Sequence, residues 1–128
     1  MQIDYTAKRS LKAGHVVDTG YTINVNLQSE NRTFESIGPR LVALDGSTVT
    51  VVHRRQNTYQ LTSAFITDTS TPDNEDMVEF LDSVISGEIF QLDLTGALAD
   101  YILDTTTYRR SRQGNLNIFT YSFRVRAL

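Results

Sequence analysis

Most of this chain has the residue pattern of β-strands, and the one clear helical signal lies in the stretch from Thr71 to Leu94. The spacing there predicts a helix over about residues 72–86, because apolar residues recur at i, i+3, i+4, i+7 and i+8. We expect Thr71 to be the N-cap, Pro72 to occupy the first turn and Gly87 to end the helix. The apolar stripe that the rest of the chain must cover consists of Met77, Phe80, Leu81, Val84 and Ile85.

The remaining patterns are those of β-strands. Residues 21–27 alternate strictly, which predicts a strand with one face on the core and the other in solvent. Shorter strands are expected over residues 3–6, 32–36 and 89–94. Residues 97–104 fit either an irregular crossing or a strand, and the pattern does not choose between them.

Two hairpins are predicted in the middle of the chain. Residues 40–44 and 47–53 flank Asp45-Gly46, a dipeptide that supplies the positive φ of a type I′ turn. A second hairpin is expected to turn across residues 54–57 and to return through residues 59–65. Together these segments predict a meander.

The C-terminal segment predicts a third hairpin, with residues 105–110 and 117–126 as its arms. Four residues of the second arm share one face: Phe119, Tyr121, Phe123 and Val125. With roughly eight to ten strands, one helix and no βαβ alternation, the sequence predicts a mainly β fold. We expect an antiparallel β-sandwich or a partly closed barrel, with the helix plugging one side or end.

Composition changes this picture little. With 128 residues, 40% hydrophobic and 21% charged, the chain is expected to form a single β-rich domain over residues 1–128 with an N-terminal arm. A net charge of −3 gives no reason to expect general nucleic-acid binding. The absence of cysteine excludes disulfides, thiol catalysis and cysteine-bound metals. Residues 1–10 lack the apolar core of a signal peptide, and no apolar run is long enough to span a bilayer.

Candidate chemistry is sparse. A general base would most naturally be His15 or His53, but a structural or surface role is favoured for both. No phosphate-binding loop, nucleophile elbow or zinc-protease motif occurs. The sequence therefore predicts no enzyme, no cofactor and no metal site. Four acidic residues of the helix are expected on its solvated face instead of in a metal or glycosidase site: Glu75, Asp76, Glu79 and Asp82.

Arginines gather at predicted strand ends and in the terminal hairpin. Clustered on one face they would suit phosphates, with Tyr108 or Tyr121 stacking on bases. We favour a subunit interface or a plain surface, because arginine is enriched in interfaces and protects edge strands from unwanted pairing. The candidate interface residues are Arg54, Arg55, Arg109, Arg110, Arg112, Arg124 and Arg126.

The order of elements also carries a resemblance. Its most specific part is E-F-L-D-S-V at residues 79–84, followed by G-E-I-F at residues 87–90 and by Asp93, with His53-Arg54 and Tyr121-Ser122-Phe123 in support. On these residues the chain resembles small minor tail proteins of long-tailed bacteriophages, or siphophages, and in particular the N-terminal ring-forming half of distal tail proteins. The resemblance covers most of the chain. It departs where the family continues into a proline-tyrosine-glycine turn, since Leu94-Thr95-Gly96 follows Asp93 here.

The resemblance implies a structural virion protein, without a catalytic residue, that forms a ring joining the tail tube to the tail tip or baseplate. By analogy the ring is a hexamer, and its partners are other copies of itself, the tail tube protein and the tail-tip or hub proteins. No specific nucleic acid and no membrane insertion are implied. The protein would be made in the host bacterial cytoplasm and reside at the tail tip of the virion.

A different class of function stays open on the residues alone. The chain also suits a small β-sandwich binding module for a host-surface saccharide or a protein partner. Stacking platforms for a saccharide would come from the tyrosines, Tyr5, Tyr21, Tyr59, Tyr101, Tyr108 and Tyr121.

Overall fold

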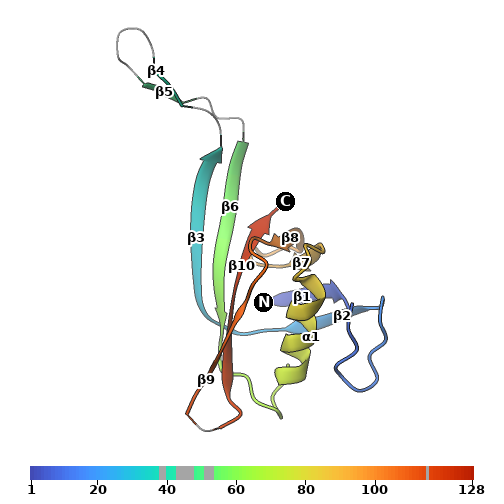
Figure 1. Ribbon diagram of the computed structural model, residues 1–128. Coiled ribbons are helices and arrows are strands. Elements are labelled where there is room, and N and C mark those ends of the chain that lie inside the picture. The colour runs from blue at the N-terminus through green and yellow to red at the C-terminus, as the bar shows by residue number, and fades with distance from the viewer. Residues whose placement is uncertain (38–39, 43–47, 51–53, 115) are drawn as a thin grey trace.

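The computed structural model describes residues 1–37, 40–42, 48–50, 54–114 and 116–128, with side chains outside residues 35–55 (Figure 1). Ten strands and one helix follow one another in these residues. Their bounds are β1 Gln2–Thr6, β2 Gly20–Asn24, β3 Leu27–Ile37, β4 Arg40–Val42, β5 Thr48–Thr50, β6 Arg54–Ser63, α1 Asn74–Val84, β7 Phe90–Leu92, β8 Ala99–Leu103, β9 Arg109–Arg112 and β10 Phe119–Ala127.

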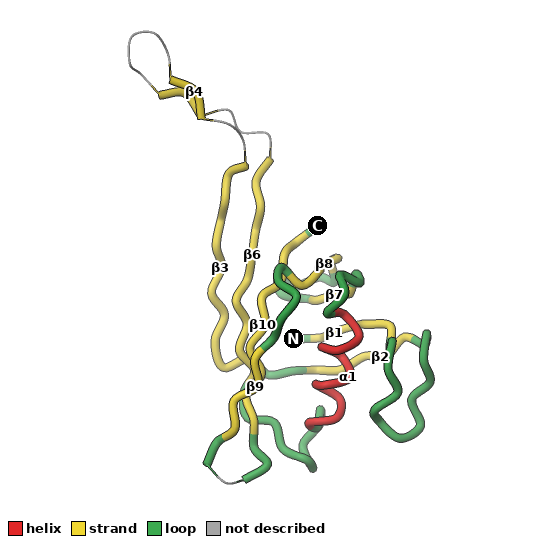
Figure 2. The backbone as a smooth tube through the Cα atoms, in the orientation of Figure 1, coloured by secondary structure: helices red, strands yellow, loops and turns green. Residues whose placement is uncertain are grey.

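Eight of the strands form one antiparallel sheet: seven follow the order β2-β1-β7-β8-β10-β6-β3, and the eighth, β9, pairs with β10 beside this path. β8 and β9 both pair with the same edge of β10, at residues 125–127 and 119–122 respectively, and β6 pairs with the other edge. β4 and β5 form a separate ribbon beyond the far end of the β3–β6 hairpin (Figure 2). The expected fold class is confirmed: the protein is mainly antiparallel β, with one helix and a C-terminal hairpin. The sheet is not closed into a barrel.

The sheet is nevertheless strongly curled, because its two edge strands are consecutive in the chain. Only Val25 and Asn26 separate β2 from β3, and the hydrogen-bond partner changes between them. The Val25 amide donates to the Met1 carbonyl at 2.8 Å, whereas the Asn26 carbonyl accepts from the Ala64 amide at 2.8 Å. Strand twist accumulated across the sheet brings its first and last strands end to end and leaves a concave face.

Helix α1 fills this concave face (Figure 1). Phe80 is fully buried, and its ring meets the rings of Tyr5, Phe90 and Phe123 edge-on at centroid distances of 5.3, 5.2 and 5.8 Å. These rings come from β1, β7 and β10, so one side chain of the helix joins both halves of the sheet. The predicted stripe is buried over most of its length, at Met77, Phe80, Leu81 and Val84.

The helix is shorter than the predicted residues 72–86: it spans Asn74–Val84, so Pro72 precedes it and does not occupy its first turn. The N-cap is Asp73, not Thr71: the Asp73 carboxylate accepts from the Asp76 amide at 2.9 Å, and the Asp76 carboxylate accepts from the Asp73 amide at 3.2 Å. This reciprocal capping box satisfies two backbone donors, which Thr71 cannot do from its position two residues earlier. At the other end Gly87 adopts φ +93° and donates its amide to the Val84 carbonyl at 3.1 Å, which stops the helix.

One predicted hairpin is wrong. Residues 54–57 do not turn; they are the first four residues of the ten-residue strand β6 and pair with residues 34–37 of β3. The segment lacks glycine and proline, and pairing with β3 satisfies its backbone groups without a turn. The preceding hairpin is present as the β4–β5 pair, while its Asp45-Gly46 turn and His53 lie outside the described residues.

The undecided segment 97–104 contains a strand, β8, which pairs with β7 and β10. The terminal hairpin is confirmed, with Phe119 paired to Arg112, but its first arm is β9, Arg109–Arg112, and not residues 105–110. Its alternation is also as predicted, since four residues of β10 are at most 6% exposed: Phe119, Tyr121, Phe123 and Val125.

Replacing Phe80 with alanine should lower the free energy of unfolding by about 3–5 kcal/mol, because the ring contacts three strands and its loss leaves a cavity. Urea denaturation followed by circular dichroism measures this. Leu116→Ala is the matched control, since Leu116 is 63% exposed and its truncation should change stability by less than about 0.5 kcal/mol. Similar losses in the two variants would contradict the central position of Phe80.

Candidate functional site

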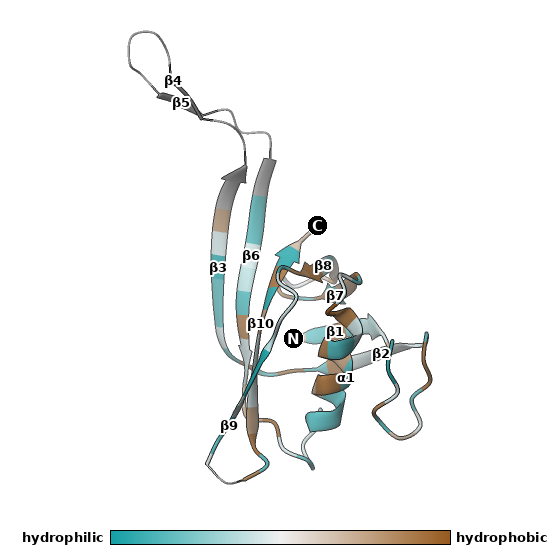
Figure 3. Ribbon diagram, in the orientation of Figure 1, coloured by the Kyte–Doolittle hydropathy of each residue, from teal (hydrophilic) through white to brown (hydrophobic). Residues whose placement is uncertain are grey.

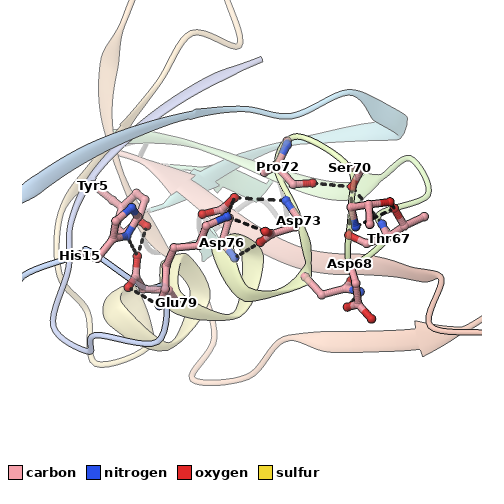
Figure 4. Close-up of polar contacts among 12 residues, drawn as sticks. Tyr5, His15, Thr67, Asp68, Ser70, Pro72, Asp73, Asp76 and Glu79 are labelled. Atoms are coloured by element: carbon pink, nitrogen blue, oxygen red, sulfur yellow. Dashed lines mark hydrogen bonds and ion pairs between the residues drawn. The ribbon is translucent and has the colours of Figure 1, made fainter.

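The most elaborate polar site surrounds Glu79, whose side chain is fully buried in the middle of α1. Tyr5 donates its hydroxyl to Glu79 Oε2 at 2.7 Å, and His15 Nδ1 contacts the same oxygen. The amides of Leu11 and Lys12 point at Oε1 from 3.1 and 3.4 Å. Figure 4 shows Tyr5 and His15 converging on the carboxylate. Because a buried charge is tolerated only when fully bonded, this carboxylate fastens the loop between β1 and β2, residues 7–19, to the helix.

Two opposing effects act on the pKa of Glu79. Burial by itself would raise the pKa, but hydrogen bonds from Tyr5, His15 and the amides of Lys12 and Leu11 outweigh it and hold the pKa below its usual value. Burial and the bond to Glu79 raise the pKa of Tyr5. Glu79 is therefore ionised at neutral pH, and Tyr5 remains a hydrogen-bond donor.

A second contact ties the same loop to the first turn of α1. The Lys12 ammonium contacts the carboxylates of Asp73 and, at 3.0 Å, Asp76. Burial would raise the pKa of Asp73, but the Lys12 ammonium and the Asp76 amide lower it overall. Near the end of the helix, the Lys8 amide donates to Ser83 Oγ at 2.9 Å. The β1–β2 loop is thus held at three levels along α1.

The prediction for the helical acids is therefore partly wrong. Glu75 is exposed, as expected, but Asp76 and Glu79 are buried, and Asp82 is partly buried and accepts a hydrogen bond from Tyr108 Oη at 2.7 Å. The periodicity of apolar residues identifies the side of α1 that faces the sheet. It does not show that the β1–β2 loop covers the polar side. A usable signal was present, since the acids Asp73, Asp76, Glu79 and Asp82 recur every three residues and the basic segment K-R-S-L-K lies elsewhere in the chain.

The candidate interface arginines do not form one surface. Arg110 and Arg112 lie opposite Tyr121 and Phe119, on the concave face of the sheet, and their guanidinium groups lie 4.3 and 5.1 Å from the Phe119 ring centre. Arg109 lies opposite Ser122, on the convex face. All residues of β9 are exposed, so this strand carries three solvent-facing arginines.

The other four arginines are placed differently. Arg124, on the convex face, is half-buried and pairs with Asp104 at 3.0 Å, and Arg126 follows it on the same face. Arg54 and Arg55 begin β6, and their side chains lie outside the described residues. Arg109 and Arg124 both line an open groove of about 610 Å³. The other lining residues are mainly polar: Gln60, Thr105, Thr107, Tyr108, Ser122 and Phe123.

The tyrosines are poorly placed as saccharide platforms. Four of them are at most 3% exposed: Tyr5, Tyr59, Tyr101 and Tyr121. The ring of Tyr21 is stacked on His15, with centroids 3.8 Å apart. Tyr108 binds Asp82, and this bond together with burial raises the pKa of Tyr108 to about 12. All six side chains therefore already serve the fold.

In the part of the chain that the structure describes, no three histidine, aspartate or glutamate side chains are grouped so as to hold a metal ion. Among the same residues, no helix has the length and apolarity needed to cross a membrane.

The fold has counterparts in solved gene transfer agent (GTA) particles. A chain in the tail of an empty GTA particle, refined with C6 symmetry, matches with a TM-score of 0.53 at 12% sequence identity, over 85% of this chain and 81% of that chain. A chain in the virion of the native GTA particle matches with a TM-score of 0.52 at 12% identity, over 85% and 84% of the two chains. No family model and no curated protein matches the sequence. The protein therefore shares its fold with chains of these GTA particles.

Replacing Glu79 with glutamine should lower the free energy of unfolding at pH 7 by about 2–4 kcal/mol, because an amide cannot accept from four donors and lacks the charge that they stabilise. Urea denaturation measures the loss. Glu75→Gln, an exposed position on the same helix, is the control and should stay within about 0.5 kcal/mol of wild type. Equal stability of the two variants would show that the buried carboxylate contributes nothing.

Protonation of Glu79 at acid pH should lower the free energy of unfolding. Its folded pKa lies below the unfolded value of 4.5, so its stabilisation is complete above pH 4.5 and is lost as pH falls through the folded pKa. Unfolding free energies measured from about pH 6 down to pH 3 should therefore fall. The free energy of unfolding of Glu79→Gln should fall less steeply with pH. A smaller pH dependence should remain, because the pKa of Asp73 is also lowered in the folded protein. Parallel curves for the two proteins would exclude Glu79 as a source of acid sensitivity.

Proposed function

We propose that this protein is a structural subunit of a phage-like tail, in which it forms a distal-tail-like ring between the tail tube and the tail tip or baseplate. The likeness to a chain of a six-fold symmetric tail carries the proposal, because it extends over 85% of this chain and 81% of the other. The protein would then reside in the virion, with further copies of itself, the tube protein and the hub proteins as partners. The proposal assigns no catalytic activity and no cofactor.

The fold has the surfaces that a ring subunit needs. A closed ring is built from heterologous contacts, in which one surface of a subunit meets a different surface of the next. The open sheet ends in two different edge strands, β2 and β3. The β3–β6 and β9–β10 hairpins project from the rest of the sheet (Figure 1).

Strand β3 in particular has the exposure of a contact surface. Every residue from Gln28 to Phe34 is exposed, and Phe34 is 66% exposed beneath the guanidinium group of Arg32, 4.1 Å from its ring centre. Colouring by hydropathy shows an apolar position on the projecting strand β3 (Figure 3). An apolar ring held at an edge strand in water suits burial against a neighbouring subunit.

Size-exclusion chromatography with light scattering, over a rising series of protein concentrations, tests this function. A closed oligomer, with ring-shaped particles in negative stain, is the expected result. If only monomer elutes, the protein is added to tail tubes of the same phage, where it should bind at tube ends. A monomer that also leaves the tube ends bare would contradict the proposed function.

A further inference from the structure

The charges of this chain are segregated along the sequence. Residues 56–108 contain no lysine or arginine, and residues 105–128 contain no aspartate or glutamate. The first segment carries Asp68, Asp73, Glu75, Asp76, Glu79, Asp82, Glu88, Asp93, Asp100 and Asp104, and the second carries Arg109, Arg110, Arg112, Arg124 and Arg126. When the two segments fold into separate surfaces, one molecule carries surfaces of opposite charge. The positive surface of one copy can then bind the negative surface of another.

The basic surface is the terminal hairpin, β9 and β10 with the connection between them, here termed the basic hairpin. Arg110 and Arg112 are exposed, and stacking on Phe119 holds both guanidinium groups on one face. Among the described residues, no carboxylate lies within 4 Å of either group. Leu116, in the connection, is 63% exposed. The hairpin therefore presents two uncompensated cations and an apolar side chain.

The surface of opposite sign lies on the convex face of the other half of the sheet. Thr22, Asp4, Gln91 and Asp100 are cross-strand partners in succession, so they form one row over β2, β1, β7 and β8. The row lines an open groove of about 390 Å³, here termed the acidic groove, which Ile89 also lines while remaining 58% exposed.

The two carboxylates of the groove are held in place but not neutralised. Asp4 Oδ1 accepts from Thr22 Oγ1 at 2.7 Å and from Gln2 Nε2 at 3.1 Å, and Asp100 Oδ1 accepts from Gln91 Nε2 at 3.2 Å. All three donors are neutral. Within the described part of the chain, no lysine or arginine nitrogen lies within 4 Å of either carboxylate. The groove therefore offers oriented negative charge to a cationic partner.

The dimensions of the two surfaces agree. Arg110 and Arg112 are two residues apart on one strand, a spacing of about 7 Å, and Asp4 and Asp100 are two strands apart, a spacing of about 10 Å. Arginine side chains are long enough to span the difference and to bind carboxylates through two hydrogen bonds each. An apolar contact between Leu116 and Ile89 would accompany the ion pairs.

We propose that the basic hairpin of one copy docks on the acidic groove of a second copy, with Arg110 and Arg112 facing Asp4 and Asp100. The contact is heterologous, since the two surfaces lie on different strands, and it can therefore repeat around a ring. This inference rests on the proposed ring function and names the contact that builds the ring.

Charge reversal in two parts tests the contact. The hairpin variant carries Arg110→Glu and Arg112→Glu, and the groove variant carries Asp4→Arg and Asp100→Arg. Each variant alone should lose the ring in light scattering. An equal mixture should regain it, because each reversed hairpin then meets a reversed groove, and a chain with all four substitutions should regain it alone. Glu75→Arg with Glu88→Arg, a pair of exposed acids outside the row, is the control and should retain the ring.

Engineered cysteines provide an independent readout, because the native chain has none. Leu116→Cys combined with Ile89→Cys should form disulfides between copies under oxidation. Non-reducing electrophoresis should then show a ladder of linked oligomers, whose largest member has the subunit number of the ring. Either cysteine alone should form no disulfide within the ring, because the contact places residue 116 of one copy against residue 89 of the next and not against residue 116. The hairpin variant in this background should lose the ladder while its thermal unfolding and circular dichroism remain those of wild type.

The outcomes separate this inference from the function on which it rests. Rings that survive both charge reversals, or that form no 116–89 disulfides, would overturn the docking contact and leave the ring function standing. A wild-type chain that forms neither rings nor disulfide ladders, and that leaves tail-tube ends bare, would overturn both.

Discussion

The burial of α1 in the concave face of the curled sheet is the constraint on which the other features of this fold depend. Because β2 and β3 follow each other in the chain yet lie at opposite ends of the strand order, the sheet curls and leaves a hollow. Phe80 fills its centre and touches β1, β7 and β10. Met77, Leu81 and Val84 are buried in the same hydrophobic cluster, so the apolar stripe of one short helix forms a core common to both halves of the sheet.

A polar interaction of the same helix holds the β1–β2 loop in place. Glu79 lies on the same helix, and burying its charge costs free energy that only a full set of donors offsets. Those donors come from β1 and from the β1–β2 loop, more than sixty residues away in sequence. The loop is thereby positioned on the helix together with Tyr21 of β2. In this way the carboxylate orders an edge of the sheet that a ring subunit would present to a neighbour.

Buried and surface polar groups differ in how fully they are paired. Among the described residues, every buried side-chain nitrogen and oxygen has a hydrogen-bond partner. At the surface, in contrast, the arginines of β9 and the carboxylates of Asp4 and Asp100 have no ion-pair partner among the residues that the structure describes. Such groups contribute little to the stability of an isolated subunit. They are more easily understood as contacts that a neighbouring copy completes.

The local periodicities of the sequence were sufficient to predict the helix, most strands and the terminal hairpin with its buried face, because each segment displays its own apolar side. Tertiary structure alone decided the remainder. Residues 54–57 became strand because β3 pairs with them, and register with β10 put Arg109 and Arg110 on opposite faces. Glu79 became buried because a distant loop covers it. A periodic pattern reports which side of an element is apolar, but the partner that covers the polar side comes from elsewhere in the chain, and only the folded topology selects it.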